Sequence, residues 1–483
     1  MTFISIEFLL FLAILVAIYY VVPHRFRWVL LLAASYLFYA TLSIQFIPLL
    51  LVSTAFTFVT GLLIERQDEK RQKKRLMMIG VSTLVLFLGW FKYFNFVNDS
   101  LRTMATSMGW NYDIPYRDVV LPLAISFYTF QAISYLVDLY RGKLKAERHY
   151  GYFSIYFAFF PQLVAGPIER AKKLLPQFKA EQRFDYEHVS YGMKRIAWGF
   201  FKKTLIADRL APMVASVFSQ PDPTGSEIVL GTMLFSLQLY ADFSACSDIA
   251  IGTARLFGIK LTENFRQPHF AVSIADFWNR WHISLSMWLR DYIFIPLCKG
   301  KKKRHQIYVA IIITFLVSGI WHGAAWSFVL WGLIHGLYRV FGDATKHQRE
   351  QMASFVRLDR TPELHKWLKI AVTFQLVCFS RVFFVSDSVA QAFHHARLYV
   401  TPSSWAPVDM LQALELFSLL DLLVFLFFFT TVQVFQYIER TKGSAWDWLS
   451  ERSAFTNVAI QLFVIVSVLV FGVSSEGFIY GGF

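Results

Sequence analysis

Two histidines in the stretch 273–335 have the residue type and the surroundings needed for proton transfer. His282 lies among polar and aromatic residues, and His322 lies in a run that is otherwise apolar enough for a membrane interior. A titratable group at membrane depth is expensive and usually marks a site or an aqueous cavity. Histidine is also the side chain whose ordinary pKa suits a general base near neutral pH. We therefore expect the two segments to form an acyl-transfer site within the bilayer.

Acyl transfer from a thioester to a hydroxyl needs a base, polar groups that hold the developing oxyanion, and exclusion of water. We expect His322 to be the base. Trp321, Ser318 and Trp326 lie close to it in sequence and are expected to line a narrow tunnel, and Gly323 allows close approach of backbone or substrate. The alternative for a lone membrane histidine is a hydrogen bond between helices.

The segment around His282 has the spacing of one helix that begins near Asp276. Apolar and aromatic residues recur at helical spacing along it, and Asn279, His282 and Ser286 follow each other at intervals of three and four. Such a helix lies in a membrane interface or lines a polar cavity. We expect His282 to be a second proton-handling or orienting group, and Asn279 to hold either the oxyanion or His282.

The apolar helix expected over 228–257 contains Asp242 and Asp248 within a polar interruption at 240–248. Ionisable groups inside a membrane are associated with function, so Asp242 could line the site. A salt bridge to a neighbouring basic side chain is the other explanation, and the sequence leaves both open.

The composition indicates a membrane protein. Hydrophobic residues make up 56% of the 483 residues and charged residues only 17%, whereas roughly a quarter of a soluble domain is charged. Mean hydropathy is +0.44. No linker or repeat of fixed period divides the chain, so we expect a single all-α polytopic membrane domain over residues 1–483.

The net charge of +14 is concentrated in basic clusters between apolar runs. In membrane proteins such clusters stay in the cytoplasm and meet anionic lipid headgroups. No nucleic-acid-binding motif accompanies them, so we expect membrane lipid as a partner and no nucleic acid. Placing the clusters inside puts both termini outside. The run 4–22 has no basic n-region and no small-x-small cleavage site before His24, so we expect it to be an uncleaved first span.

The apolar runs predict about 11 transmembrane helices plus re-entrant and interfacial helices. The segment 152–170 is short and contains Pro161, Gly166 and Pro167. Non-helical backbone at membrane depth must be buried in protein or face water, so we expect this segment to be re-entrant or interfacial. The apolar runs are 4–22, 28–40, 46–64, 76–97, 119–140, 186–206, 228–257, 307–320, 326–341, 367–385, 411–437 and 454–473.

No nucleotide-binding loop, dinucleotide fingerprint or Gly-x-Ser-x-Gly elbow is present. Cys246, Cys298 and Cys378 lie far apart and show no pairing or metal-ligand spacing. We therefore expect no bound cofactor and no metal, and a donor that arrives as a substrate.

The residues resemble the membrane-bound O-acyltransferase (MBOAT) superfamily, in its bacterial branch of alginate O-acetyltransferases and teichoic-acid D-alanyltransferases. The resemblance runs nearly the full length. FWNRWHISLS (277–286) followed by WLRDY (288–292) is highly specific and is similar to the alginate O-acetylase type. The other stretches that carry the resemblance are 160–168, 240–248, 263–265 and 319–323.

The resemblance implies a ring of tilted membrane helices around a thinned centre with a tunnel. A cytosolic funnel admits the acyl donor there, and an opposite opening meets the acceptor. His322 matches the active-site histidine of the superfamily, and His282 matches the second functionally important histidine of this branch.

The last residues resemble a Phe-x-Tyr-Phe-x-Phe tail, in which a terminal tyrosine accepts the acyl group and relays it. Phe478, Tyr480 and Phe483 match this pattern, and Gly481 departs from it. We expect residues 474–483 to form an external C-terminal tail with Tyr480 as a relay. A frayed chain end is the alternative.

These observations together predict a multi-pass protein of the bacterial inner membrane that moves acetyl from a cytosolic thioester, acetyl-CoA, to a secreted exopolysaccharide such as alginate. A periplasmic polysaccharide acetyltransferase is the expected partner. The alternatives are D-alanyl transfer from a carrier protein to a cell-envelope polymer, a non-enzymatic transporter, and a scaffolding subunit of a secretion complex. A transporter would be favoured by inverted repeats, and the sequence shows none.

Overall fold

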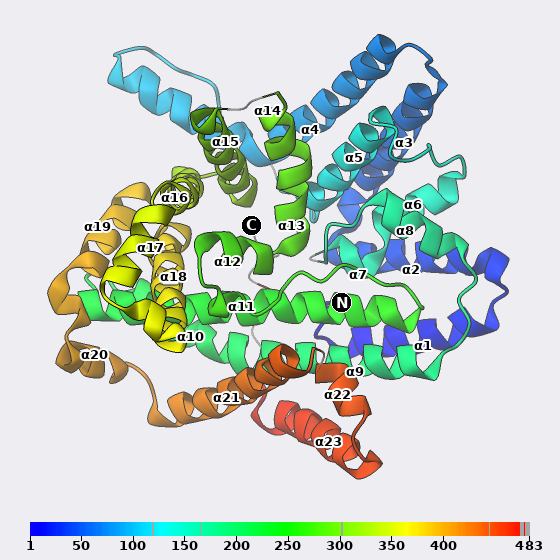
Figure 1. Ribbon diagram of the computed structural model, residues 1–483. Coiled ribbons are helices and arrows are strands. Elements are labelled where there is room, and N and C mark those ends of the chain that lie inside the picture. The colour runs from blue at the N-terminus through cyan, green and yellow to red at the C-terminus, as the bar shows by residue number, and fades with distance from the viewer. Residues whose placement is uncertain (118–119, 165, 301–302, 444, 474–477, 479–483) are drawn as a thin grey trace. The chain divides into compact units, whose positions relative to one another are not determined.

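The computed structural model describes residues 1–117, 120–164, 166–300, 303–443, 445–473 and 478 (Figure 1). Helices joined by turns and loops make up this part of the chain, and it contains no strand. The chain divides into two compact units, Met1–Met193 with Ala250–Thr262, and Lys194–Ile249 with Glu263–Phe483. The all-helical prediction is confirmed, and the prediction of a single domain remains a prediction.

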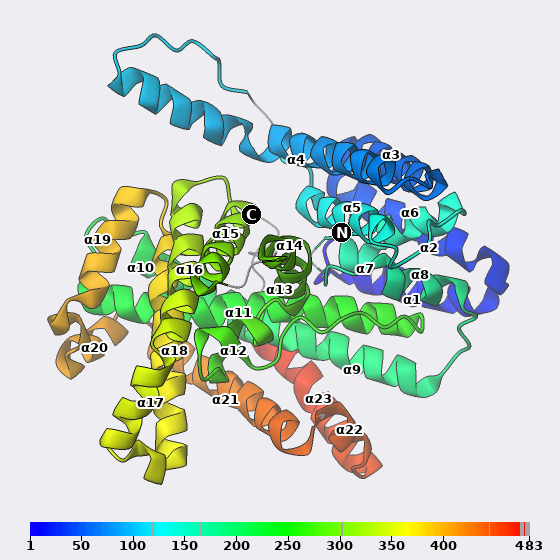
Figure 2. The ribbon, with the colours of Figure 1, turned by 45° about the horizontal axis from the view of Figure 1, so that its top comes forward.

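The first unit is built on three neighbouring helices, α3, α4 and α5, which contact one another. Figure 2 shows α4 running beside α3 and then extending beyond it. The helices of this unit are α1 (Ile6–Val21), α2 (His24–Ser43), η1 (Ile44–Phe46), α3 (Ile47–Arg66), α4 (Lys70–Ser107), α5 (Ile125–Tyr140), α6 (Tyr150–Ala158), α7 (Phe160–Leu163), α8 (Ala171–Lys179) and the first part of α9 (Tyr186–Lys202).

The segment predicted to be re-entrant forms two short helices, α6 and α7. The His149 side chain accepts a hydrogen bond from the Tyr152 amide at the start of α6, and Pro161 lies in the first turn of α7. Neither helix is long enough to cross a bilayer, and residues 153–163 are all buried. As predicted, this segment is not a lipid-facing span.

The second unit contains the predicted chemistry-bearing residues. Its elements are the end of α9, η2 (Lys203–Ala207), α10 (Asp208–Phe218), the larger part of α11 (Gly225–Leu256), η3 (Pro268–Phe270), α12 (Ile274–Arg280), α13 (Ile283–Leu289), η4 (Arg290–Phe294), α14 (Ile295–Cys298), α15 (Arg304–His322), α16 (Trp326–Ala344), α17 (Lys346–Phe355), η5 (Leu358–Arg360), α18 (Pro362–Val385), α19 (Val389–Val400), η6 (Pro402–Trp405), α20 (Pro407–Leu414), α21 (Leu419–Lys442), α22 (Ala445–Ser450) and α23 (Ala454–Phe471).

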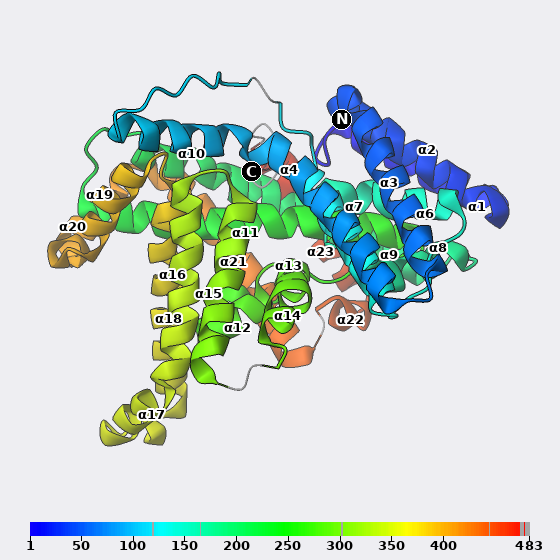
Figure 3. The same ribbon diagram turned by 90° about the horizontal axis from the view of Figure 1, so that it is seen from above.

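Helices α15 and α16 pack closely because glycines face each other across their interface. A Cβ atom at Gly319 would meet the Phe328 carbonyl oxygen and would lie 3.2 Å from the Cα of Gly332. Small residues at such positions let two helix backbones approach, as is usual between membrane helices. Helix α16 also contacts α18, and Figure 3 shows the three helices side by side with α17 at the end of α16.

Seven helical stretches of described residues are long and apolar enough to cross a membrane, which supports a multi-pass membrane protein. The predicted number of about 11 crossings is not established by this set, and α1 is a shorter apolar helix. The seven stretches are His24–Arg66, Lys70–Ser107, Gly225–Leu256, Arg304–His322, Pro362–Val385, Leu419–Lys442 and Ala454–Phe471.

Candidate active site

His322 is the last residue of α15, and its side chain is buried. The helix ends there because Gly323 is fully extended, with φ −161° and ψ 154°. A Cβ atom at Gly323 would collide with the ring of Phe328, so the glycine makes room for a packed side chain. His322 thus lies at a helix end deep in the second unit.

Aromatic rings surround the His322 imidazole. The rings of Trp321, Trp331 and Phe384 have their centroids 5.0, 4.9 and 5.6 Å from it. Trp326, which is expected to line the tunnel, begins α16, and its side chain is 55% exposed. Helix α15 ends before Trp326, so the helical phase that would bring this residue toward His322 is lost. Trp331, one turn into α16, occupies that place.

His282 lies in a turn between α12 and α13, with φ 42° and ψ 56°. This left-handed conformation is uncommon for a residue other than glycine and costs on the order of 1–3 kcal/mol. The prediction of one continuous helix from Asp276 is therefore wrong. The predicted stripe of Trp278, Trp281, Leu285 and Trp288 is nevertheless buried, because both short helices direct these residues inward.

Asn264 supplies the hydrogen bonds that the His282 turn needs. Its carbonyl oxygen accepts from the Ile283 amide at 3.0 Å, and its Oδ1 accepts from the Ser284 amide at 3.2 Å. These amides belong to the first turn of α13, where a helix has no intrahelical acceptors. His282 is the residue at the cap position, and its own side chain makes no capping bond. A residue 18 positions upstream therefore holds the His282 backbone in place.

Trp321 contacts both histidines and joins them into one site. Its ring centroid lies 5.9 Å from that of His282 and 5.0 Å from that of His322. His282 is fully buried and also packs edge-on against Phe243 at 4.7 Å. Burial lowers the pKa of His282 to about 3, because the apolar surroundings disfavour the charged imidazole. His282, which lies outside the seven apolar stretches, is thus neutral at ordinary pH.

Two of the predicted supporting residues do not join the histidines. Asn279 is exposed on α12, whereas His282 is buried, because the break in the helix turns the two side chains apart. Asp242 is buried in α11 and pairs with Lys203 at 2.9 Å, so the salt-bridge explanation for Asp242 is confirmed. The expected interruption of this helix is wrong, since α11 is continuous from Gly225 to Leu256.

Ser318 lies one turn before His322 on α15 and is fully buried, and its tunnel-lining role remains a prediction. Its Oγ has no hydrogen-bond partner among the described residues, and neither has Nε1 of the buried Trp331. An unsatisfied buried polar group costs about 1–3 kcal/mol. Ser318 Oγ and Trp331 Nε1 can therefore form hydrogen bonds with a molecule that enters the site beside His322.

His335 serves a structural purpose. Its Nδ1 accepts a hydrogen bond from the Trp278 indole at 3.3 Å, and its Nε2 lies 2.9 Å from Ser380 Oγ. It thereby connects α12, α16 and α18. His269 packs against Tyr240 at 4.9 Å and against Phe374 at 5.5 Å.

Arg381 was missed by sequence reasoning. It is 2% exposed in α18, and its guanidinium carbon lies 4.8 Å from the Trp281 ring and 5.4 Å from the Phe384 ring. Trp281 precedes His282 in the sequence, and Phe384 contacts the His322 ring. Arg381 therefore contacts a neighbour of each histidine. The signal was available in the sequence, because an arginine near the end of an apolar span is expensive.

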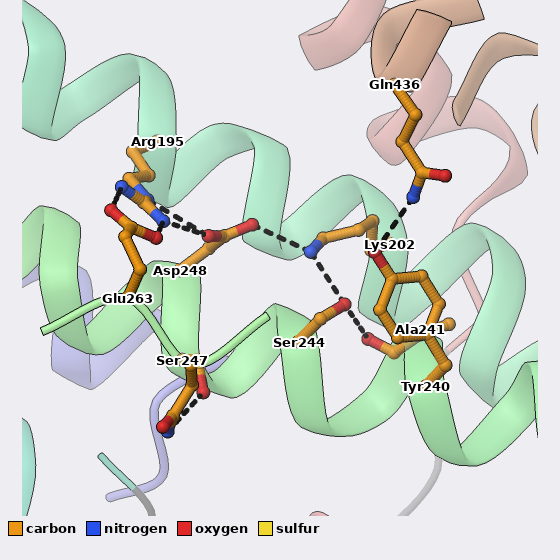
Figure 4. Close-up of polar contacts among 10 residues, drawn as sticks. Arg195, Lys202, Tyr240, Ala241, Ser244, Ser247, Asp248, Glu263 and Gln436 are labelled. Carbon is orange, nitrogen blue, oxygen red and sulfur yellow. Dashed lines mark hydrogen bonds and ion pairs between the residues drawn. The ribbon is translucent and has the colours of Figure 1, made fainter. Parts of the chain in front are cut away.

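An ion network joins α9, α11 and the loop that follows α11 (Figure 4). We use this name for Arg195, Lys202, Asp248 and Glu263. Asp248 accepts from Arg195 Nε at 2.9 Å and from Lys202 Nζ at 2.7 Å, and Arg195 also binds both carboxylate oxygens of Glu263. Since Glu263 precedes Asn264, the network also holds the loop that supports the His282 turn.

The end of α23 and the tail contact η2. In the π-helical turn η2, the Thr204 carbonyl accepts a hydrogen bond from the Val473 amide at 3.1 Å. Arg209, in α10, donates a hydrogen bond to the Phe471 carbonyl at 2.8 Å. Within the predicted tail, Phe478 lies with its ring 4.7 Å from Lys203 Nζ. Tyr480 lies outside the described residues.

Comparisons with known proteins show the family of this chain. A sequence profile described as the membrane-bound O-acyltransferase family matches residues 31–386. The chain is 38% identical over 415 residues to the probable alginate O-acetylase of Azotobacter vinelandii, covering 86% of this chain and 81% of the relative. It is 33% identical to the peptidoglycan O-acetyltransferase of Helicobacter pylori (75% and 71% covered) and 29% identical to the teichoic acid D-alanyltransferase of Bacillus subtilis (58% and 72% covered). The match to the family profile includes both histidines.

Proposed function

Because the chain belongs to the membrane-bound O-acyltransferase family, and is thus an acyl-transferring enzyme, we propose that it acetylates a secreted exopolysaccharide such as alginate. The acetyl group comes from a cytosolic thioester, acetyl-CoA, and crosses the bacterial inner membrane. The observation that carries this proposal is the burial of His322 at the end of an apolar helix, in contact through Trp321 with His282.

In the proposed reaction His322 is the general base. Its imidazole takes the proton of an acceptor hydroxyl, and the hydroxyl oxygen bonds to the thioester carbon. The carbonyl oxygen then carries a negative charge until the carbon–sulfur bond breaks, and the thiolate recovers the proton from His322. His282 is neutral and is held in its turn by Asn264. Its role is to orient Trp321, which contacts His322. The aromatic shell excludes water, which would otherwise hydrolyse the thioester.

The test of this proposal is donor turnover by purified protein in nanodiscs supplied with acetyl-labelled acetyl-CoA. We expect release of free CoA, with label transferred to an acceptor or retained on the protein. Absence of turnover with acetyl-CoA, together with turnover of a D-alanyl thioester on a carrier protein, would contradict the proposed donor. That alternative is supported by the similarity to a teichoic acid D-alanyltransferase.

We further propose that Tyr480 is the first acceptor and passes acetyl to a periplasmic polysaccharide acetyltransferase. The contacts of Phe471 and Val473 with Arg209 and η2 support this proposal, because they hold the chain that leads to the tail. Incubation with acetyl-CoA should add one acetyl group, about 42 Da, to the C-terminal peptide in mass spectrometry, and Tyr480→Phe should remove that addition. An unmodified peptide in turning-over wild-type protein would contradict the relay.

A further inference from the structure

Beside His322 lie two hydrogen-bond donors whose partners are not supplied by the described residues. Ser318 is fully buried and Trp331 is 1% exposed, and neither Ser318 Oγ nor Trp331 Nε1 has a hydrogen-bond partner there. Buried polar groups are nearly always paired, so each exception needs an explanation. An indole N–H can only donate, and the missing partner of Trp331 must therefore be an acceptor.

The two donors come from different helices and converge on the same imidazole. Ser318 precedes His322 by four residues, so the two side chains share one face of α15. Trp331 belongs to α16, and its ring stands edge-on to the His322 ring at 4.9 Å and 86°. The close glycine contact between Gly319 and Gly332, one residue from each donor, fixes the distance between the two helices at this level.

The neighbouring polar groups of this helix cluster are paired, unlike these two. The indole of Trp278 donates to His335, and His335 pairs with Ser380. The packing therefore satisfies the hydrogen bonds of Trp278 and His335, whereas Ser318 Oγ and Trp331 Nε1 have no hydrogen-bond partner among the described residues. This arrangement fits a reaction in which an acceptor oxygen is present only while substrate is bound.

Resting on the proposed function, we infer that Trp331 Nε1–H and the Ser318 hydroxyl form the oxyanion-binding site of the acyl transfer. When the acceptor oxygen bonds to the thioester carbon, the electron pair of the C=O bond moves to its oxygen, and both donors bind that oxygen. When the C–S bond breaks, the pair returns and the charge leaves with the thiolate. Preorganised donors of this kind stabilise the transition state more than the ground state.

The test compares Trp331→Phe, Ser318→Ala and the double variant with wild type, in nanodiscs with acetyl-CoA. Phenylalanine keeps an aromatic ring and removes the N–H. We expect kcat to fall by about 10²–10³-fold for Trp331→Phe, a smaller fall for Ser318→Ala, and unchanged binding of a non-transferable thioether analogue of acetyl-CoA. The matched control is Trp405→Phe, because the Trp405 indole donates at 2.8 Å to the Tyr399 carbonyl, in contact with neither histidine.

Equal kcat in Trp331→Phe and Trp405→Phe would overturn the inference, and so would a loss of turnover matched by an equal loss of analogue binding. Thermal unfolding of each variant separates a folding defect from a catalytic one. If wild type turns over a carrier-bound thioester and not acetyl-CoA, the proposed donor is wrong. The same variants measured with the active donor then still decide whether the two groups bind the oxyanion.

Discussion

Replacing His322 with alanine is expected to lower the rate of acetyl transfer by about 10²–10⁴-fold, the usual share of a general base. Polymer acetylation in cells should fall below detection, because the ring neighbours of His322 among the described residues, Trp321, Trp331 and Phe384, are not bases of suitable strength. His322→Gln tests the same loss with less change of volume. Both are measured as CoA release by purified protein and as acetyl content of the secreted polymer.

The matched control is His395→Gln. His395 is also a buried histidine of the second unit, but it lies in α19 and pairs with Ser386 at 3.3 Å. We expect this variant to retain turnover, with at most a modest loss of thermal stability. Retained acetylation in both His322 variants would refute its role as base and would favour a structural histidine.

Replacing Asp248 with alanine is expected to produce a large loss of stability. The change leaves Arg195 and Lys202 buried without the carboxylate they share, with their side chains only 8% and 6% exposed. Removing one partner of a buried ion pair costs about 3–5 kcal/mol, because the remaining charge keeps its desolvation penalty. The midpoint of thermal unfolding in detergent should fall, and the yield of monodisperse protein with it.

The control for this prediction is Asp343→Ala, which removes an exposed ion pair. Asp343 lies 3.0 Å from Arg304, with side chains 52% and 63% exposed, and such surface pairs contribute about 0–1 kcal/mol. Adding Lys202→Met to Asp248→Ala should restore part of the lost stability by removing one uncompensated cation. Similar unfolding midpoints for Asp248→Ala and Asp343→Ala would show that the ion network contributes little to stability.

Sequence reasoning selected His282 and His322, which the structure buries around Trp321, because their signal is local. A histidine inside an apolar run, and a stripe of tryptophans at helical spacing, can be read from a few neighbouring residues. The same reasoning wrongly predicted one continuous helix through His282. Apolar residues recur there at helical spacing, but the backbone forms a left-handed turn between α12 and α13. The turn is stabilised by Asn264, and sequence spacing carries no information about hydrogen bonds from a separate loop. The contact of Trp331 with His322 was missed for a related reason, since the end of α15 resets the helical phase.

The amino-acid sequence by itself determined the membrane character, the helical class, the family resemblance and the burial of His322, since these follow from residue type and short-range spacing. Only the tertiary structure decided which groups meet. It paired Asp242 with Lys203, stacked Arg381 on Trp281, and brought Trp331 to His322 while leaving Asn279 exposed. Each of these outcomes depends on how helices pack, and helix packing is set by the summed complementarity of many side chains.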